Sequence, residues 1–243
     1  MSGHSKWANI KHKKEKSDSQ RGKIFTKLGR ELAIAVRSGG ADPEANSRLK
    51  DVIAKAKANN MPNDNIMRSI KKAAGDGDGA SFEEITYEGY GPGGVAVIVE
   101  AATDNRNRTA GDIRHYFDKF GGNLGQSGSV SFLFNRKGVL LLEKTSKTVE
   151  DDLMLEALDA GAEDFNTEED YFEITTDPND FSKVREALEK KAYEFMEADV
   201  EMLPVTTTKL MDPKQIEQMD RLIENLEDMD DVQNVYHNWE QDE

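Results

Sequence analysis

The sequence contains no cysteine, and this absence excludes several kinds of site at once. Disulfide bonds, zinc sites built from thiolates and cysteine nucleophiles all need that side chain. Long apolar runs are missing too: residues 95–99 are bounded by Gly94 and Glu100, far short of the about 20 residues that span a bilayer. The N-terminal MSGHSKW lacks the apolar core of a secretory signal. We therefore expect a cytoplasmic protein without a membrane partner.

Patterns that mark catalysis are also absent. The four histidines show no metal-ligand spacing, and no Ser/His/Asp arrangement or pair of catalytic carboxylates can be singled out. The acidic EDMDDV at 227–232 lacks the glycine and terminal glutamate of a calcium loop, and we interpret it as a solvated helix end. We expect no catalytic residue, metal, cofactor or small-molecule substrate, and hence not an enzyme.

Two glycine-rich segments resemble ligand loops but differ from them in detail. YEGYGPGG at 87–94 lacks the Gly-Lys-Ser/Thr end of a phosphate-binding loop. GGNLGQSG at 121–128 follows a predicted helix and precedes a predicted strand, which is not the order of a dinucleotide-binding loop. We interpret both as turns that need positive φ. The alternative is a platform that an RNA backbone approaches closely.

Charge is strongly segregated along the chain. The formal net charge of −15 would by itself disfavour a nucleic-acid partner. Residues 1–75, however, hold 17 of the 32 Lys and Arg residues but 7 of the 47 Asp and Glu, so they carry +10 and the remainder carries −25. The basic segment attracts polyanions and the acidic remainder repels them.

The basic residues concentrate in residues 6–30, where only Glu15 and Asp18 oppose them. Lysines and arginines neutralise phosphates and release counterions, and the ring of Trp7 could stack on an unpaired base. The alternative is a solvated tail that aids solubility. The candidate nucleic-acid-binding residues here are Lys6, Trp7, Lys11, Lys13, Lys14, Arg21, Lys23, Lys27 and Arg30.

A second candidate site is TDNRNRT at 103–109, a predicted loop between a buried strand and a helix. We predict Thr109 as the N-cap of that helix, with Asp112 completing a capping box. Guanidinium groups near a helix N-terminus suit a phosphate or a base edge. The alternative is a structural loop in which Asp104 and the asparagines cap backbone. The candidates are Asn105, Arg106, Asn107, Arg108, Arg114 and His115.

Hydrophobic spacing predicts an α+β fold: an N-terminal three-helix bundle followed by two ferredoxin-like α/β domains, one inserted in the other. Helical spacing runs from Arg21 to a stop at Gly39, and recurs after Asp42-Pro43 and again after Met61-Pro62, where Gly75 ends it. Strands are expected at 94–101 and 130–134, then a β-α-β-β-α-β order over 139–203, and a last β-α-β over 206–236.

This reading divides the chain into four parts. They are a basic flexible arm (1–20), a helical head domain (21–81), a discontinuous α/β domain (82–135 plus 205–239) and an inserted ferredoxin-like α/β domain (136–204). The sequence leaves the oligomeric state open.

Eight blocks of the sequence together resemble the YebC/PmpR family over residues 3–238. They are GHSKWANIKHKK, RGKIFTKLGREL, DPEANSRL, NNMPNDNI, YEGYGPGG, TDNRNRT, GGNLGQSGSVSFLF and LEDMDDVQNVYHN; residues 144–200 carry few diagnostic positions. The resemblance implies three domains, the first helical and the others α/β, and no known catalysis. By match of motif, it implies nucleic-acid contacts at Lys6, Trp7, Lys11, Arg106 and Arg108.

Two functions stay open at this point. The resemblance favours a DNA-binding transcriptional regulator, although other members look like ribosome-associated translation factors, and the mitochondrial members are translational activators of cytochrome oxidase. The residues favour RNA within the ribosome, because no helix-turn-helix with a recognition helix is evident and a basic arm with one aromatic suits single-stranded RNA. Either way we expect a regulator of gene expression whose partner is nucleic acid.

Overall fold

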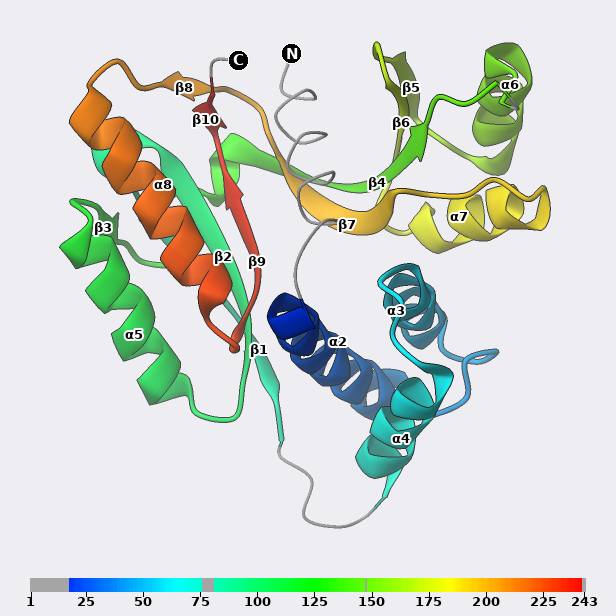
Figure 1. The fold of residues 1–243 in the computed structure, drawn as a ribbon, viewed down its shortest axis with the longest axis horizontal. Coiled ribbons are helices and arrows are strands. Elements are labelled where there is room, and N and C mark those ends of the chain that lie inside the picture. The colour runs from blue at the N-terminus through cyan, green and yellow to red at the C-terminus, as the bar shows by residue number, and fades with distance from the viewer. Residues whose placement is uncertain (1–17, 76–80, 147, 242–243) are drawn as a thin grey trace.

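The fold is α+β, as the sequence predicts. The computed structural model describes residues 18–75, 81–146 and 148–241. Within these residues, three packed helices precede two four-stranded antiparallel sheets, and each sheet carries two helices on one face (Figure 1).

The first three helices form the helical head. They are α2 (Asp18–Gly39), α3 (Ser47–Ala58) and α4 (Asn63–Ala74). Their inward faces share one core that includes Leu32, Leu49 and Ile66. The turn before α3 is held by Asn46, whose buried side chain accepts a hydrogen bond from the Leu49 N–H and so caps the helix. The predicted helices are confirmed, and α2 begins three residues before Arg21.

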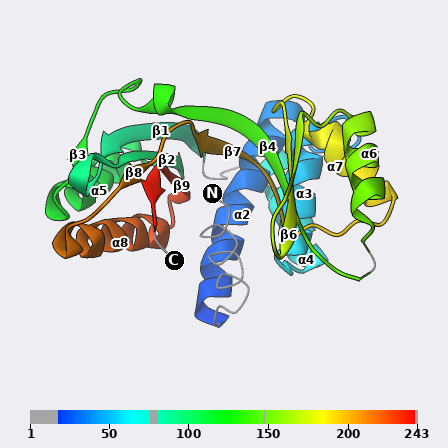
Figure 2. The same cartoon turned by 90° about the horizontal axis from the view of Figure 1, so that it is seen from above.

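The outer sheet has the strand order β3-β1-β2-β9. Its strands are β1 (Glu83–Tyr90), β2 (Ala96–Thr103), β3 (Asn123–Leu124) and β9 (Val232–His237). Helices α5 (Arg106–Lys119) and α8 (Pro213–Asp228) cover one face, where Val97 and Val99 pack on Phe117 and Leu222 (Figure 2). Strand β2 is buried along almost its whole length, as the apolar run predicts.

One prediction in this region is wrong, and one strand was not predicted. Residues 130–134 were expected to form a strand, but Ser131–Leu133 is the short 3-10 turn η2 and the strand begins at Phe134. Strand β1 was not expected, because Gly and Glu in EEITYEGY obscure its alternation. Of the segment interpreted as a turn, residues 87–90 belong to β1, while Gly93 and Gly94 in η1 (Pro92–Gly94) do take positive φ.

The inserted sheet has the strand order β5-β6-β4-β7. It comprises β4 (Phe134–Glu143), β5 (Asp164–Thr167), β6 (Tyr171–Thr176) and β7 (Glu197–Pro204), with helices α6 (Glu150–Ala160) and α7 (Phe181–Lys190). This chain order, β-α-β-β-α-β, is the predicted ferredoxin-like one. The outer sheet reaches a similar arrangement by the order β-β-α-β-α-β.

The last predicted β-α-β unit differs in its first strand. Strand β8 (Thr208–Lys209) is short and pairs in parallel with β10 (Trp239–Glu240), not with the outer sheet. Helix α8 and strand β9 form as predicted.

The long strands β4 and β7 run from the inserted sheet to the outer sheet (Figure 2). At the outer end, Phe134 and Met202 pack against Ala96 and Ile98, on the face that α5 and α8 leave uncovered. Since β9 completes the outer sheet after the chain has left the inserted one, the topology supports the discontinuous division of the chain that we propose. None of the helices in the described ranges is long and apolar enough to span a bilayer.

Candidate nucleic-acid interface

Two of the candidate residues, Arg30 and Arg108, meet at the carboxylate of Asp231, where the helical head contacts the outer sheet. Arg30 of α2 donates to Oδ1 over 2.5 Å, and Arg108 of α5 donates to Oδ2 over 2.9 Å. The Thr109 hydroxyl also donates to Oδ2, over 2.7 Å, and that of Thr103 lies 3.4 Å away. The carboxylate therefore joins α2, α5 and the start of β9.

This carboxylate is 7% exposed, yet it remains charged. Burial raises its pKa, but hydrogen bonds from Thr109, Arg108 and Arg30 outweigh burial and lower the pKa to about 2. A buried carboxylate is stable only when its oxygens are hydrogen-bonded and its charge is paired, and both conditions hold here.

Arg30 is committed to this junction by further contacts. Its guanidinium donates to the carbonyl oxygens of Ala102, over 2.9 Å, and Asp230, over 2.8 Å. It also lies over the ring of Phe82, 5.1 Å from the centroid. A predicted phosphate-binding residue thus holds the helical head to β2 and to the turn before β9.

Two more α2 cations contact the end of α8. Lys23 forms an ion pair with Asp228, and Lys27 donates to the carbonyl oxygen of Glu227 over 2.7 Å. The interpretation of residues 227–232 as a solvated helix end is correct for the end of α8 at Asp228, which is 69% exposed, but it misses the contacts with α2 and the burial of Asp231. The opposite charges of the two segments were visible in the sequence, but about 200 residues separate them.

The start of α5 also differs from the prediction. The N-cap is Asn105, whose side chain accepts from the Arg108 N–H over 3.1 Å, and the helix begins at Arg106. Thr109, predicted as the cap, is buried inside the helix with its hydroxyl 2.8 Å from that of Thr103. The donors at 106–108 therefore form the first turn of a helix and not a loop.

The candidates fall into three groups. Lys23, Lys27, Arg30, Asn105 and Arg108 make contacts within the protein. Asn105 and Arg108 are also exposed, as are Arg21 on α2 and Arg106, Asn107, Arg114 and His115 on α5. Outside the described residues lie Lys6, Trp7, Lys11, Lys13 and Lys14.

Helix α4 presents a basic face that the sequence analysis did not single out. Arg68, Lys71 and Lys72 are exposed, and within the described ranges no ion pair involves them. Their i, i+3, i+4 spacing places them on one side of the helix, which is the signal that would have identified them.

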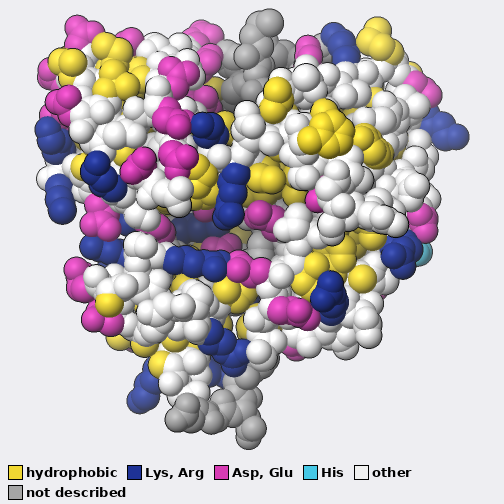
Figure 3. Space-filling model, turned by 180° about the vertical axis from the view of Figure 1, so that it is seen from behind, with side chains coloured by type: hydrophobic (Ala, Val, Ile, Leu, Met, Phe, Trp, Pro, Cys, Tyr) yellow, Lys and Arg dark blue, Asp and Glu magenta, His cyan; other side chains and the backbone are white. Residues whose placement is uncertain are grey.

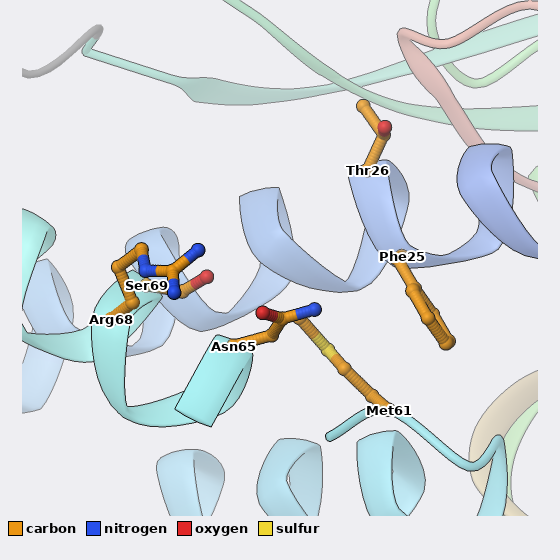
Figure 4. A pocket seen from close by; sticks show the side chains of 6 residues that line it. All are labelled: Phe25, Thr26, Met61, Asn65, Arg68 and Ser69. Carbon is orange, nitrogen blue, oxygen red and sulfur yellow. The ribbon is translucent and has the colours of Figure 1, made fainter. Parts of the chain in front are cut away.

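A shallow hollow lies beside this face, between α2 and α4 (Figure 4). It is lined by Phe25 and Thr26 of α2 and by Met61, Asn65, Arg68 and Ser69, so the lining mixes apolar and polar groups. In the described part of the chain, no cluster of acidic residues and histidines could hold a metal ion.

A second polar junction ties the helical head to the inserted sheet. Lys55 of α3 lies 3.0 Å from Glu31 of α2 and 2.6 Å from Asp199 of β7. Burial lowers the pKa of Lys55, but the charges of Asp199 and Glu31 outweigh burial and raise it. The side chain is thus a cation shared by two carboxylates.

Arg185 of α7 reinforces this junction. Its side chain is 3% exposed and lies 3.0 Å from Asp51 of α3 and 2.6 Å from Glu189. Basic and acidic side chains intermingle on the face seen in Figure 3, so much of the charge of the head is matched locally. None of these pairs was predicted, and all except Arg185–Glu189, which lies within α7, join distant parts of the sequence.

The structure is that of an α+β protein with a helical head, and exposed cations lie on α4 and α5. Family models for the TACO1/YebC N-terminal domain and for the TACO1/YebC second and third domain match residues 5–76 and 82–239. The chain belongs to the TACO1/YebC family, as the resemblance to YebC/PmpR proteins predicted.

Close relatives carry regulatory names. A probable transcriptional regulatory protein of Acetivibrio thermocellus is 72% identical over 98% of this chain and 99% of its own. One of Ruminiclostridium cellulolyticum with the same description is 73% identical over 100% of this chain and 98% of its own. The crystal structure of a conserved hypothetical protein from Aquifex aeolicus is 46% identical and superposes with a TM-score of 0.84, covering 94% of this chain and 93% of that one.

Proposed function

We propose that this protein is a regulator of gene expression that binds DNA through the basic N-terminal segment and the exposed cations of α4 and α5. The observation that carries the proposal is the segregation of charge, +10 in residues 1–75 against −25 in the remainder. The names of the relatives, probable transcriptional regulatory proteins, support DNA as the target. The proposal includes a cytoplasmic location and no catalytic role.

The contacts within the protein narrow the interface. Cations that face the body, such as Arg30 and Lys55, are matched by carboxylates and are poor candidates for phosphate contact. Arg106 and Arg114 on α5 are exposed, and in the described ranges neither side chain has an ion pair. These cations can approach phosphates without first breaking a contact.

Arg108 has a supporting part in this interface. Its guanidinium bridges Asp104 and Asp231, 2.9 Å from each, which fixes the first turn of α5. A fixed helix presents Arg106 at a defined position, as directional contact with a phosphate or base edge requires.

The salt dependence of duplex DNA binding tests the proposal. Each phosphate contact adds about −0.9 to the slope of log affinity against log salt. We compare the wild type with the double variant Arg106→Gln/Arg114→Gln and with Lys183→Gln/Lys190→Gln, which removes two exposed cations of α7 as a matched control.

The expected result is a slope that becomes shallower by about two in the α5 variant and stays unchanged in the α7 control. Equal slopes for all three proteins would reject α5 as part of the interface. Competition with ribosomal RNA at one salt concentration separates DNA from the RNA alternative: tighter binding to RNA would assign the protein to translation instead.

A further inference from the structure

Phe132 is a large aromatic side chain held in solvent by a well-packed turn. It is 70% exposed, whereas Val130 and Phe134 on either side of it are 0% and 6% exposed. These two neighbours belong to a core formed with Ala96 and Ile98 of β2. The turn η2 is thus anchored at both ends by buried side chains, while the Phe132 ring between these ends packs into no hydrophobic core of the protein.

A buried carboxylate holds the segment that leads to this ring. Glu88 of β1 is 6% exposed and accepts hydrogen bonds from the backbone N–H groups of Gly128, Val130 and Ser131, over 2.8, 2.9 and 2.8 Å. Burial raises the pKa of Glu88, but these backbone hydrogen bonds outweigh burial and lower it. The Glu88 carboxylate therefore makes this turn rigid, and a rigid turn holds the exposed ring in a defined position.

Other exposed apolar groups lie beside the turn. Tyr90, 38% exposed, donates from its hydroxyl to the carbonyl oxygen of Ser129 over 3.3 Å. Val205, 57% exposed, is bonded through its N–H to the carbonyl oxygen of Leu133 over 2.8 Å.

The charge around the turn favours a polyanion over an apolar peptide. Residues 119–142 contain no Asp or Glu, although the chain has 47 of them, and they include Lys119, Arg136 and Lys137. Lys137 is paired with Glu163, but Arg136 is exposed, two residues after Phe134 on β4. In so acidic a protein, this is a segment that does not repel phosphates.

We propose that the η2 surface, defined as Phe132, Tyr90, Val205 and Arg136, binds an unpaired nucleobase of single-stranded DNA or RNA. An exposed ring stacks on the face of any base, and the exposed guanidinium of Arg136 can donate hydrogen bonds to a phosphate of the same strand. Gly128, where an added Cβ would meet no atom within 4 Å, leaves room for the strand to approach the backbone. This surface uses neither α5 nor the N-terminal segment, so the inference goes beyond the proposed function and does not depend on it.

The test is fluorescence anisotropy of the full chain with labelled oligo-dT, oligo-rU and a duplex. The variants are Phe132→Ala, Phe132→Leu, which keeps an apolar side chain, and Phe132→Trp, which keeps a larger ring. Leu155→Ala on α6 is the matched control, because Leu155 is also exposed, at 59%, but lies on another helix.

We expect Phe132→Ala and Phe132→Leu to weaken single-strand binding roughly tenfold, the scale of one stacked base, with duplex binding and melting temperature unchanged. Phe132→Trp and Leu155→Ala should bind like the wild type. Comparable affinities for oligo-dT and oligo-rU would support recognition of the base face alone, and a preference for oligo-rU would support RNA as its source.

Three results would overturn the proposal. They are wild-type affinity in Phe132→Ala, equal losses for single strands and duplex, and failure of the wild type to bind either single strand. A change of sedimentation coefficient in Phe132→Ala without a loss of binding would show instead that the η2 surface is a contact between copies. Because the binding of duplex DNA depends on α5, a failure of the single-strand proposal can be distinguished from a failure of the proposed function.

Discussion

Arg30 and Asp231 lie 201 residues apart in the sequence and form an ion pair of 2.5 Å between Nη1 and Oδ1. Their side chains are only 15% and 9% exposed, so the pair is largely removed from water. It fixes the helical head on the outer sheet at the point where α5 begins. Because Arg30 makes this contact, its guanidinium is not available to bind a phosphate.

Asp231→Asn should destabilise the protein by about 2–3 kcal/mol, because an amide leaves the Arg30 guanidinium without its counter-charge and removes one of the two carboxylates that bind Arg108. Urea denaturation measures the change. Asp104→Asn is the control: Asp104 pairs with the same Arg108 but is 45% exposed, so its loss should lower stability by at most about 1 kcal/mol. Equal effects of the two substitutions would contradict the central position of Asp231.

The contribution of Asp231 should also depend on pH. Its pKa in the folded protein is lowered to about 2 from 3.8, so the stability it provides is complete above the unfolded value and declines as the pH falls toward 2. The difference in unfolding free energy between wild type and Asp231→Asn should therefore shrink between about pH 4 and pH 2. A difference that stays constant over that interval would show that the carboxylate is not the source of the effect.

Arg106 and Arg108 should respond differently to replacement by lysine. Arg108→Lys loses the fork that bridges Asp104 and Asp231, so it should lower thermal stability. Arg106→Lys should leave the melting temperature unchanged but weaken specific DNA binding roughly tenfold, the scale of one charge-assisted contact. Calorimetry and a binding assay with specific and random duplexes measure the two effects, and identical behaviour of the two variants would argue against separate roles.

Removal of residues 1–16 should flatten the salt dependence of nucleic-acid binding by several units, since roughly four to six cations of that segment are expected to contact phosphates. The melting temperature of the remaining chain serves as the control for folding. If the truncated and full-length proteins share one slope, the affinity comes from elsewhere on the surface.

Apolar spacing and turn residues predicted the helices and strands that are determined by neighbouring residues in the sequence. The three helices of the head follow from apolar spacing and stop signals, and the inserted sheet follows from β4, which is buried on both faces. Strand β1 was missed because the reason for its glycine lies in distant residues. A Cβ on Gly89 would lie 2.6 Å from the carbonyl oxygen of Asn123 and 2.8 Å from the ring of Phe117, so only glycine fits there. No residue near Gly89 in the sequence predicts that contact.

The sequence predicted which residue types make up the candidate site, but not which of its cations are paired with carboxylates of the protein. The sequence identifies a basic segment and a donor-rich turn, yet which cations are available depends on carboxylates far along the chain. Lys23 is taken by Asp228 and Arg108 by Asp231, and both acids lie in a segment that looked solvated. Likewise, Asn105 rather than Thr109 caps α5, because the Thr109 hydroxyl is held by Asp231.

Ultraviolet crosslinking in cells, followed by purification and digestion with DNase or RNase, tests the central claim most directly. The account predicts crosslinked nucleic acid that DNase removes, in an amount that falls in Arg106→Gln/Arg114→Gln and is unchanged in Lys183→Gln/Lys190→Gln. Crosslinked material that resists DNase and is removed entirely by RNase, or the absence of any crosslink, would contradict it.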